Sequence, residues 1–224
     1  MDQLNINENI LKFINGNKKN KGLHPTERYA SFDYCFNYFQ PFRERGIIDQ
    51  IVDPKNLQIS CLQLGFYLAS WGMLRGSAPL LQKSVKFYQP LLEYIASAPR
   101  ELWEIDANCY SPSNIQLLLD GRWNICQALS SCGASDILVT KIMLGVFGNV
   151  PAFDSSFKHG FGVSTFGKSA LDKIQKFYTE NQEVIEIHRI RTIDFVTGKP
   201  TNRIYTRAKV IDMIFFIQGS KYSS

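Results

Sequence analysis

The sequence predicts a mainly α-helical protein built as two helical lobes. Apolar residues recur at helical spacing in most long segments, and 45% of the 224 residues are hydrophobic, which is enough for a compact core. Strand signals are few: Val184 to Ile193 alternates irregularly and fits either a helix or an edge strand. No internal repeat or low-complexity segment interrupts this pattern.

The N-terminal part begins with a short helix, which the polar run Asn15 to Gly22 ends as an exposed loop. Its lysines are candidates for phosphate contacts: Lys18, Lys19 and Lys21. Seven aromatic residues then lie between Tyr29 and Phe42. On a helix, four of them share one stripe and predict core: Tyr29, Phe32, Phe36 and Phe39.

The remaining helices follow from apolar periodicity and from start and stop residues. They are expected at Leu57 to Leu74, Leu80 to Ala98, Ser113 to Ser130, Ser169 to Asn181 and Tyr205 to Gln218. Ser113 and Ser169 are candidate N-caps, and Pro90 is expected to break or kink its helix. The segment Pro99 to Pro112 is a candidate joint, so we expect an N-terminal lobe over residues 1–105 and a second lobe over 106–224, with one compact domain as the alternative.

The segment from Thr140 to Phe157 is the strongest candidate for chemistry. The residues between Gly133 and Gly148 predict a largely buried helix that carries one lysine, Lys141. A buried ammonium must reach water, a phosphate or a carboxylate. The turn that follows, Gly-Asn-Val-Pro151, gives the chain a stiff course and delivers a single carboxylate, Asp154.

Both residues also have an ordinary structural explanation. Asp154 is followed by Ser155 and Ser156 and could serve only as a helix N-cap. Lys141 could be a surface lysine whose aliphatic stem covers apolar neighbours.

The stretch from Ile125 to Phe161 resembles the helix-hairpin-helix DNA glycosylase superfamily, in which a hairpin's second helix leads through a Gly/Pro-rich loop to an aspartate. Ser131-Cys-Gly-Ala-Ser135 occupies the position of the hairpin. The resemblance implies that Asp154 stabilises the positive charge on the sugar or orients the attacking water. It also implies that Lys141, by its position, forms a Schiff base if the protein has lyase activity.

The charge distribution fits a DNA partner. The formal net charge is +5, and the excess lies in Lys158 to Ser224, with 11 basic and 6 acidic residues. Such a region favours a polyanion, although a solvated basic surface is an equally simple explanation. From this basic region and the hairpin region together we expect five residues to contact DNA: Gly148, Asn149, Lys158, His159 and Lys168.

A base-binding pocket is expected from polar and aromatic residues in the N-terminal lobe. Its candidate residues are Asp33, Tyr34, Tyr38, Trp71 and Arg75. Alternatively, Asp33 and Arg75 form a buried ion pair. Gly72 and Gly76 leave room for a bulky base, so damaged bases and the bulky modified cytosines of phage genomes are both open as substrates.

We expect no metal or organic cofactor. The five cysteines show no CxxC spacing and only three histidines accompany them, which favours reduced thiols in a cytoplasmic protein. No membrane segment or signal peptide is expected, and the protein is expected to be a monomer. The main alternative function is a non-catalytic helical module that binds nucleic acid or a protein partner.

Overall fold

The protein is mainly helical in the computed structural model, which describes residues 4–17, 21–130 and 133–221. The α-helices of this described part are α1 (Ile6–Asn15), α2 (Ala30–Glu44), α3 (Pro54–Ser70), α4 (Gln89–Ser97), α5 (Pro112–Ala128), α6 (Asp136–Phe147), α7 (Ser155–Phe161), α8 (Lys168–Glu180), α9 (Gln182–Ile187) and α10 (Arg207–Ser220). Two strands, β1 (Arg191–Ile193) and β2 (Pro200–Ile204), pair antiparallel. Lys18, Lys19, Ser131 and Cys132 lie outside the described residues.

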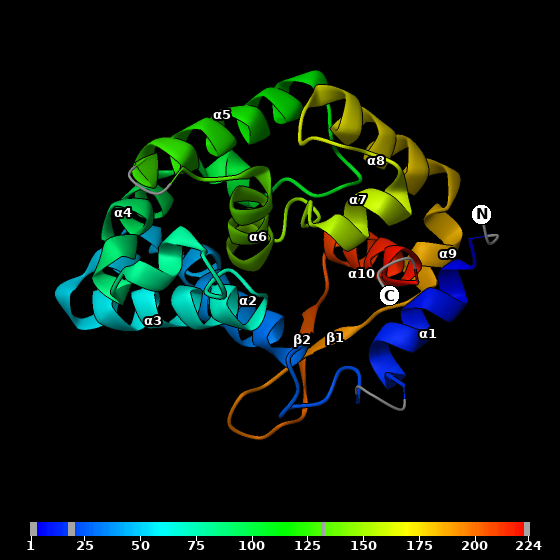
Figure 1. The fold of residues 1–224 in the computed structure, drawn as a ribbon, viewed down its shortest axis with the longest axis horizontal. Helices are drawn as coiled ribbons and strands as arrows, with labels where there is room; N and C mark the ends of the chain where they lie inside the picture. Colours follow the sequence, from blue (N-terminus) through cyan, green and yellow to red (C-terminus); the bar gives the residue numbers. More distant parts are fainter. Residues whose placement is uncertain (1–3, 18–20, 131–132, 222–224) are drawn as a thin grey trace.

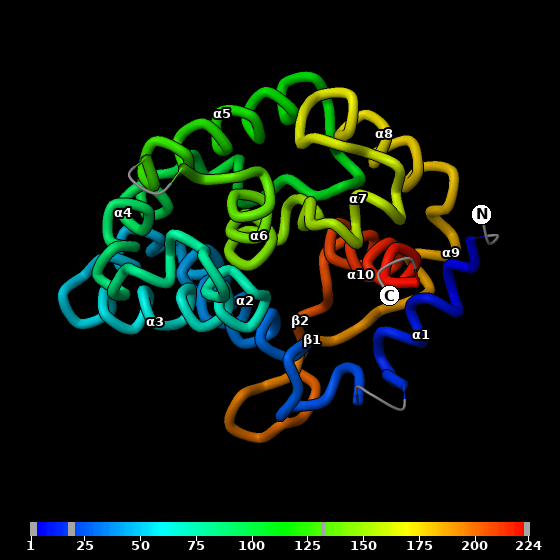
Figure 2. The backbone as a smooth tube through the Cα atoms, in the orientation of Figure 1, coloured from blue at the N-terminus to red at the C-terminus, as the bar shows by residue number. Residues whose placement is uncertain are grey.

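The helices form two groups on either side of α6 (Figure 1). One group contains α2, α3 and α4, and the other contains α7, α10, α9 and α1, while α5 and α8 close the top of the arch. Helix α1 packs against α10 and α9, so the first helix lies beside the last one, and its Phe13 ring stacks on Tyr29 at the start of α2. The chain then passes beside the β1–β2 turn before it enters α2 (Figure 2).

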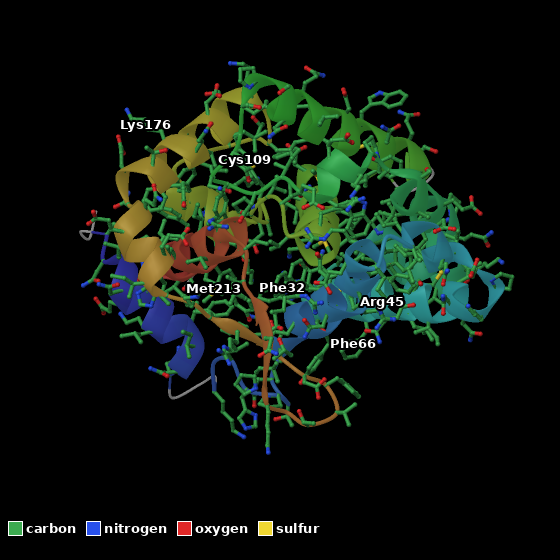
Figure 3. The ribbon with its side chains drawn as sticks, turned by 180° about the vertical axis from the view of Figure 1, so that it is seen from behind. Phe32, Arg45, Phe66, Cys109, Lys176 and Met213 are labelled. Atoms are coloured by element: carbon green, nitrogen blue, oxygen red, sulfur yellow. The ribbon has the colours of Figure 1, made fainter. Side chains whose placement is uncertain are left out.

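The aromatic stripe of α2 forms core, as the sequence predicts. Tyr29, at its N-cap, and Phe32, Phe36 and Phe39 are all buried. Figure 3 shows Phe32 and Met213 near the centre of the molecule, between the two helix groups. Burial of these rings therefore joins α2 to α10, which are far apart in the sequence.

Several helix ends differ from the prediction. The expected helix from Leu80 to Ala98 is divided into two short 3-10 helices, Pro79–Gln82 and Val85–Tyr88, and α4. Pro90 occupies the first turn of α4, where its missing N–H costs nothing. Helix α5 is capped by Ser111 rather than Ser113, because the Ser111 hydroxyl accepts the Asn114 N–H. Helix α8 starts after Gly167 without a side-chain cap, so the prediction of a Ser169 cap is wrong.

The ambiguous segment from Val184 to Ile193 is partly helix and partly strand. It contains the end of α9 and then β1, whose partner β2 the sequence did not predict. The pairing is short, with Arg191 opposite Ile204 and Ile193 opposite Pro200. Asp33 on α2 holds this sheet, because its Oδ2 accepts the Ile193 N–H at 2.7 Å.

Helices α7 and α10 approach each other closely, and this contact fixes the start of α7. Gly160 faces the backbone of Phe215, and Gly219 faces the backbone of Ser156. A Cβ at either glycine would collide with backbone atoms of the other helix. Because both positions are glycine, α7 can lie close against α10. Asp154, which immediately precedes α7, is therefore held beside α10.

Candidate functional site

Lys141 lies deep inside the protein, in the middle of α6. The helix begins at the Ser135 cap and ends at Gly148, whose φ of 72° suits glycine. Its apolar residues are buried on all sides, and Lys141 itself is only 4% exposed. Its Nζ donates a hydrogen bond to the Trp71 carbonyl oxygen at 2.7 Å and lies 3.8 Å from Asp154 Oδ2. Lys141 is thus a buried amine, not a surface lysine.

The loop that carries Asp154 is held by two side chains. Thr140 Oγ1 on α6 accepts the Phe153 N–H at 2.9 Å, and Asp212 Oδ1 on α10 accepts the Ala152 N–H at 3.0 Å. Sequence reasoning missed both residues. The available signal was a charged pair, Lys209 and Asp212, within an otherwise apolar helix. These two bonds fix the backbone on the N-terminal side of Asp154.

Asp154 is both a helix cap and a neighbour of Lys141. Its Oδ1 accepts the Phe157 N–H at 3.0 Å and caps α7. Its Oδ2 accepts no hydrogen bond from the described residues and faces the Lys141 ammonium. The cap and the chemical role are therefore compatible, because each uses a different carboxylate oxygen.

Burial shifts the ionisation of both groups toward their neutral forms. Burial lowers the pKa of Lys141, although Asp154 and Asp212 act against this, and Arg28 and Arg75 lower it further. Burial also raises the pKa of Asp154, and the nearby Asp212 adds to that effect. Burial therefore favours the neutral amine of Lys141, whereas the Asp154 carboxylate favours the protonated ammonium.

Aromatic rings and a second lysine surround the pair. Lys209, on α10, donates to Asp212 Oδ2 at 2.8 Å and lies 4.7 Å from the Phe32 ring centroid and 5.4 Å from that of Trp71. The Trp71 ring stacks on Tyr29 with centroids 5.7 Å apart. The site is thus a charged cluster enclosed by aromatic residues at the junction of α3, α6, α7 and α10.

The five predicted pocket residues do not come together. Tyr34 donates its hydroxyl hydrogen bond to Pro25 O at 2.6 Å, and the Tyr38 hydroxyl bonds Ser60 Oγ at 2.8 Å. Asp33 is fully buried beneath the sheet. Only Trp71 and Arg75 lie near Lys141.

The predicted ion pair between Asp33 and Arg75 is also wrong. Asp33 accepts hydrogen bonds from the Tyr205 hydroxyl at 2.5 Å and from the Ile193 N–H. Both partners come from segments more than 150 residues further along the chain. These neutral donors satisfy the carboxylate without an arginine.

The expected DNA contacts divide into two groups. Gly148 and Asn149 are packed inside: Asn149 is fully buried, its side-chain amide donates to Leu102 O, and its carbonyl accepts the Tyr110 hydroxyl. They are therefore not available to DNA. The other three line one open cavity of about 690 Å³ between α7 and α8: Lys158, His159 and Lys168.

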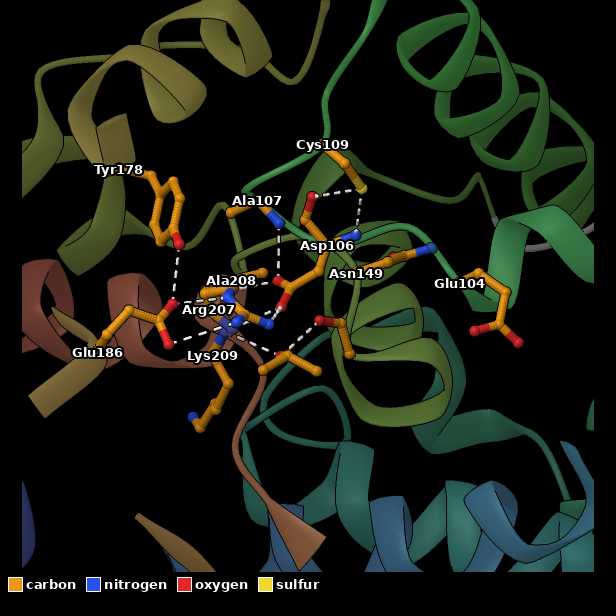
Figure 4. A network of polar contacts seen from close by, with 12 residues as sticks. Glu104, Asp106, Ala107, Cys109, Asn149, Tyr178, Glu186, Arg207, Ala208 and Lys209 are labelled. Atoms are coloured by element: carbon orange, nitrogen blue, oxygen red, sulfur yellow. Dashed lines mark hydrogen bonds and ion pairs between the residues drawn. The ribbon is translucent and has the colours of Figure 1, made fainter. Parts of the chain in front are cut away.

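A second buried carboxylate lies on the other side of the Asn149 turn. Asp106 accepts the N–H groups of Ala107, Arg207 and Ala208 at 2.7 to 2.9 Å, and Arg207 in turn pairs with Glu186 at 2.7 Å (Figure 4). Burial raises the pKa of Asp106, while these donors lower it. The network fastens the segment before α5 to the start of α10.

Comparisons with protein-family models, with curated proteins and with solved structures gave no match to this chain. No helix in the described part of the chain is long and apolar enough to span a membrane. Among the described residues, no three acidic, histidine or cysteine side chains are grouped so that they could hold a metal ion.

Proposed function

We propose that this protein is a DNA N-glycosylase that excises a damaged or modified base and leaves an abasic site. The observation that carries the proposal is the Lys141–Asp154 pair. One oxygen of Asp154 is fixed by the cap of α7, and the other faces a buried amine at 3.8 Å without a hydrogen bond from the described residues. The carboxylate is thus held in place with one oxygen available for a substrate or water.

Asp154 would act on the sugar of an extruded nucleotide. As the bond to the base breaks, positive charge develops on the sugar, and a fixed carboxylate in an enclosed site stabilises that charge. The same oxygen can accept a proton from the water that attacks the sugar carbon. The hydrogen bonds from Phe153 to Thr140 and from Ala152 to Asp212 support this role, because they limit reorganisation of the loop.

Lys141 determines whether the enzyme would also cleave the DNA strand. Its lowered pKa increases the fraction of neutral amine, which is the form that attacks a sugar carbon. In the structure the Lys141 Nζ donates a hydrogen bond to the Trp71 carbonyl oxygen. Lyase activity would require this hydrogen bond to break, whereas base excision by Asp154 alone would not.

DNA binding would use the basic cavity between α7 and α8. Lys158 and His159 belong to α7, and Lys168 begins α8, so the same short helix that Asp154 caps also carries cavity residues. Cationic side chains gain affinity for DNA by releasing condensed counterions. A duplex bound here would lie on the helix that positions the proposed catalytic aspartate. The helix groups around α6 would then serve as the two lobes of a glycosylase-like fold.

A second candidate function is a non-catalytic nucleic-acid-binding or partner-binding module. The cap hydrogen bond of Asp154 favours it, because a capping aspartate needs no further role. In that case the Lys141–Asp154 pair would only satisfy two buried charges.

The test is to incubate the purified protein with DNAs that carry ordinary, damaged or phage-modified bases and to detect free base by mass spectrometry. We expect release from at least one DNA, together with new abasic sites, and loss of both in the Asp154→Asn variant. Salt-dependent binding without release from any DNA would favour the binding module. Borohydride trapping on abasic DNA tests Lys141, and an adduct absent from Lys141→Met would assign lyase activity to it.

A further inference from the structure

Two exposed arginines lie at the outer edge of the Lys141–Asp154 site. Arg28 precedes α2, and its guanidinium carbon lies 5.1 Å from the Trp71 ring centroid and 5.5 Å from that of Tyr29. Arg75 follows α3. Neither arginine forms an ion pair with a carboxylate in the parts of the chain that the structure describes. Two arginines without a carboxylate partner among the described residues therefore lie on segments beside the site.

The backbone beside Trp71 places Arg75 over the site. Gly72 has a φ of 80°, and a Cβ built on it would lie 3.1 Å from Arg75 Nε. The guanidinium thus folds back over Gly72, next to the Trp71 carbonyl that holds Lys141. A side chain at position 72 would strain the turn and crowd the guanidinium.

The charges of the cluster do not balance. Four cations, Arg28, Arg75, Lys141 and Lys209, lie around three carboxylates, Asp154, Asp212 and Asp33, the last of which interacts with Lys209, so the formal excess is one positive charge. Both arginines act on Lys141, since each lowers its pKa. Trp71 Nε1 is enclosed and finds no hydrogen-bond acceptor among the residues that the structure describes. An anion bound at the edge of the site would compensate the excess charge.

We propose that Arg28 and Arg75 form a phosphate clamp that binds the DNA phosphates flanking the extruded nucleotide. This inference rests on the proposed function for its choice of ligand. The planar guanidinium presents paired donors that match phosphate oxygens. Clamping the phosphates on either side of one nucleotide would position its sugar over Asp154, and the anions would raise the fraction of protonated Lys141.

The test measures binding of a short DNA that contains one abasic-site analogue, by fluorescence anisotropy at several salt concentrations. Each of Arg28→Gln and Arg75→Gln should weaken binding about 5- to 10-fold and lower the slope of log Kd against log salt by about one. Arg45→Gln is the matched control, since Arg45 is exposed and lies at the end of α2. It should change Kd less than about twofold. Lysine at either clamp position should restore part of the affinity.

Uncharged backbone linkages in the DNA test which phosphates the two arginines bind. Replacing the two phosphates that flank the analogue by methylphosphonates should weaken wild-type binding and remove the difference between wild type and Arg75→Gln. Unchanged affinity and salt slope in the folded Arg28→Gln/Arg75→Gln double variant would overturn the clamp. Competition by inorganic phosphate at micromolar concentration would also overturn it, because the site would then take a free phosphate.

The binding test of the phosphate clamp does not depend on base release. If no DNA loses a base but the two arginines still determine binding to flanking phosphates, the clamp stands and the glycosylase proposal fails. If bases are released and the double variant binds and reacts like wild type, the glycosylase proposal stands and the clamp fails.

Discussion

Asp106 and Asp154 are both buried aspartates beside a helix start, yet their surroundings differ. Asp106 accepts three backbone N–H groups and lies 3.5 Å from the Arg207 guanidinium, so both of its oxygens are occupied. Asp154 accepts one N–H, and its second oxygen faces Lys141 without a hydrogen bond from the described residues. Burial raises the pKa of both carboxyls. The difference indicates a structural carboxylate in the first case and an available one in the second.

Asp33 extends the comparison to a third carboxylate, which accepts two hydrogen bonds and interacts with Lys209 but forms no ion pair with the described residues. Its pKa is raised by burial from 3.8 to about 7, so the carboxyl contributes stability below pH 4 that is lost as the pH rises through 7. The free energy of unfolding of wild type relative to Asp33→Asn should therefore fall by about 4 kcal/mol between pH 4 and pH 8. Urea unfolding of both proteins at several pH values measures this. If the difference in the free energy of unfolding between wild type and Asp33→Asn did not change with pH, a raised pKa of Asp33 would be contradicted.

The Asp106→Ala variant tests the occupied carboxylate. It leaves three N–H groups without their acceptor and removes one of the two carboxylates beside the Arg207 guanidinium, so the free energy of unfolding should fall by about 3 kcal/mol. Chemical denaturation measures the change. Asp120→Ala, at an exposed position on α5, is the control and should change stability by less than about 0.5 kcal/mol. Equal effects would show that the Asp106 network does not stabilise the fold.

The difference between Asp154→Ala and Asp154→Asn isolates the cap, because both variants lose the carboxylate that faces Lys141, and this difference should be a smaller effect. Loss of the Phe157 hydrogen bond should cost about 1 kcal/mol, whereas asparagine at the same position should restore most of it. Thermal melting of the Asp154→Ala and Asp154→Asn variants measures the two changes in stability. An asparagine variant as unstable as the alanine variant would show that the charge of Asp154, and not its cap, stabilises the protein.

The sequence predicted local features well. The helix that carries Lys141, its end at Gly148 and the buried stripe of α2 follow from apolar spacing and glycine position. The sequence left two possibilities for Lys141, a buried amine or a surface lysine whose stem covers apolar neighbours, and the structure shows that it is buried.

Long-range partners could not be predicted in the same way. The donors to Asp33 come from β1 and from Tyr205, and no local pattern specifies which distant group satisfies a buried carboxylate. Asn149 is a second example: it was expected to contact DNA, but its side chain donates to Leu102 O and its carbonyl accepts the Tyr110 hydroxyl. The sequence predicted a site at Lys141 and Asp154, and the structure places these two side chains 3.8 Å apart, while the roles of Thr140 and Asp212 required the fold.

The most direct test of the central claim is a single-turnover measurement of base release by wild type and Asp154→Asn at equal DNA occupancy. We predict that the variant melts within about 0.5 kcal/mol of wild type, because asparagine also caps helices. We predict that it retains DNA binding and releases base at least about 100-fold more slowly. Equal rates of release would contradict the assignment of Asp154 as the catalytic carboxylate.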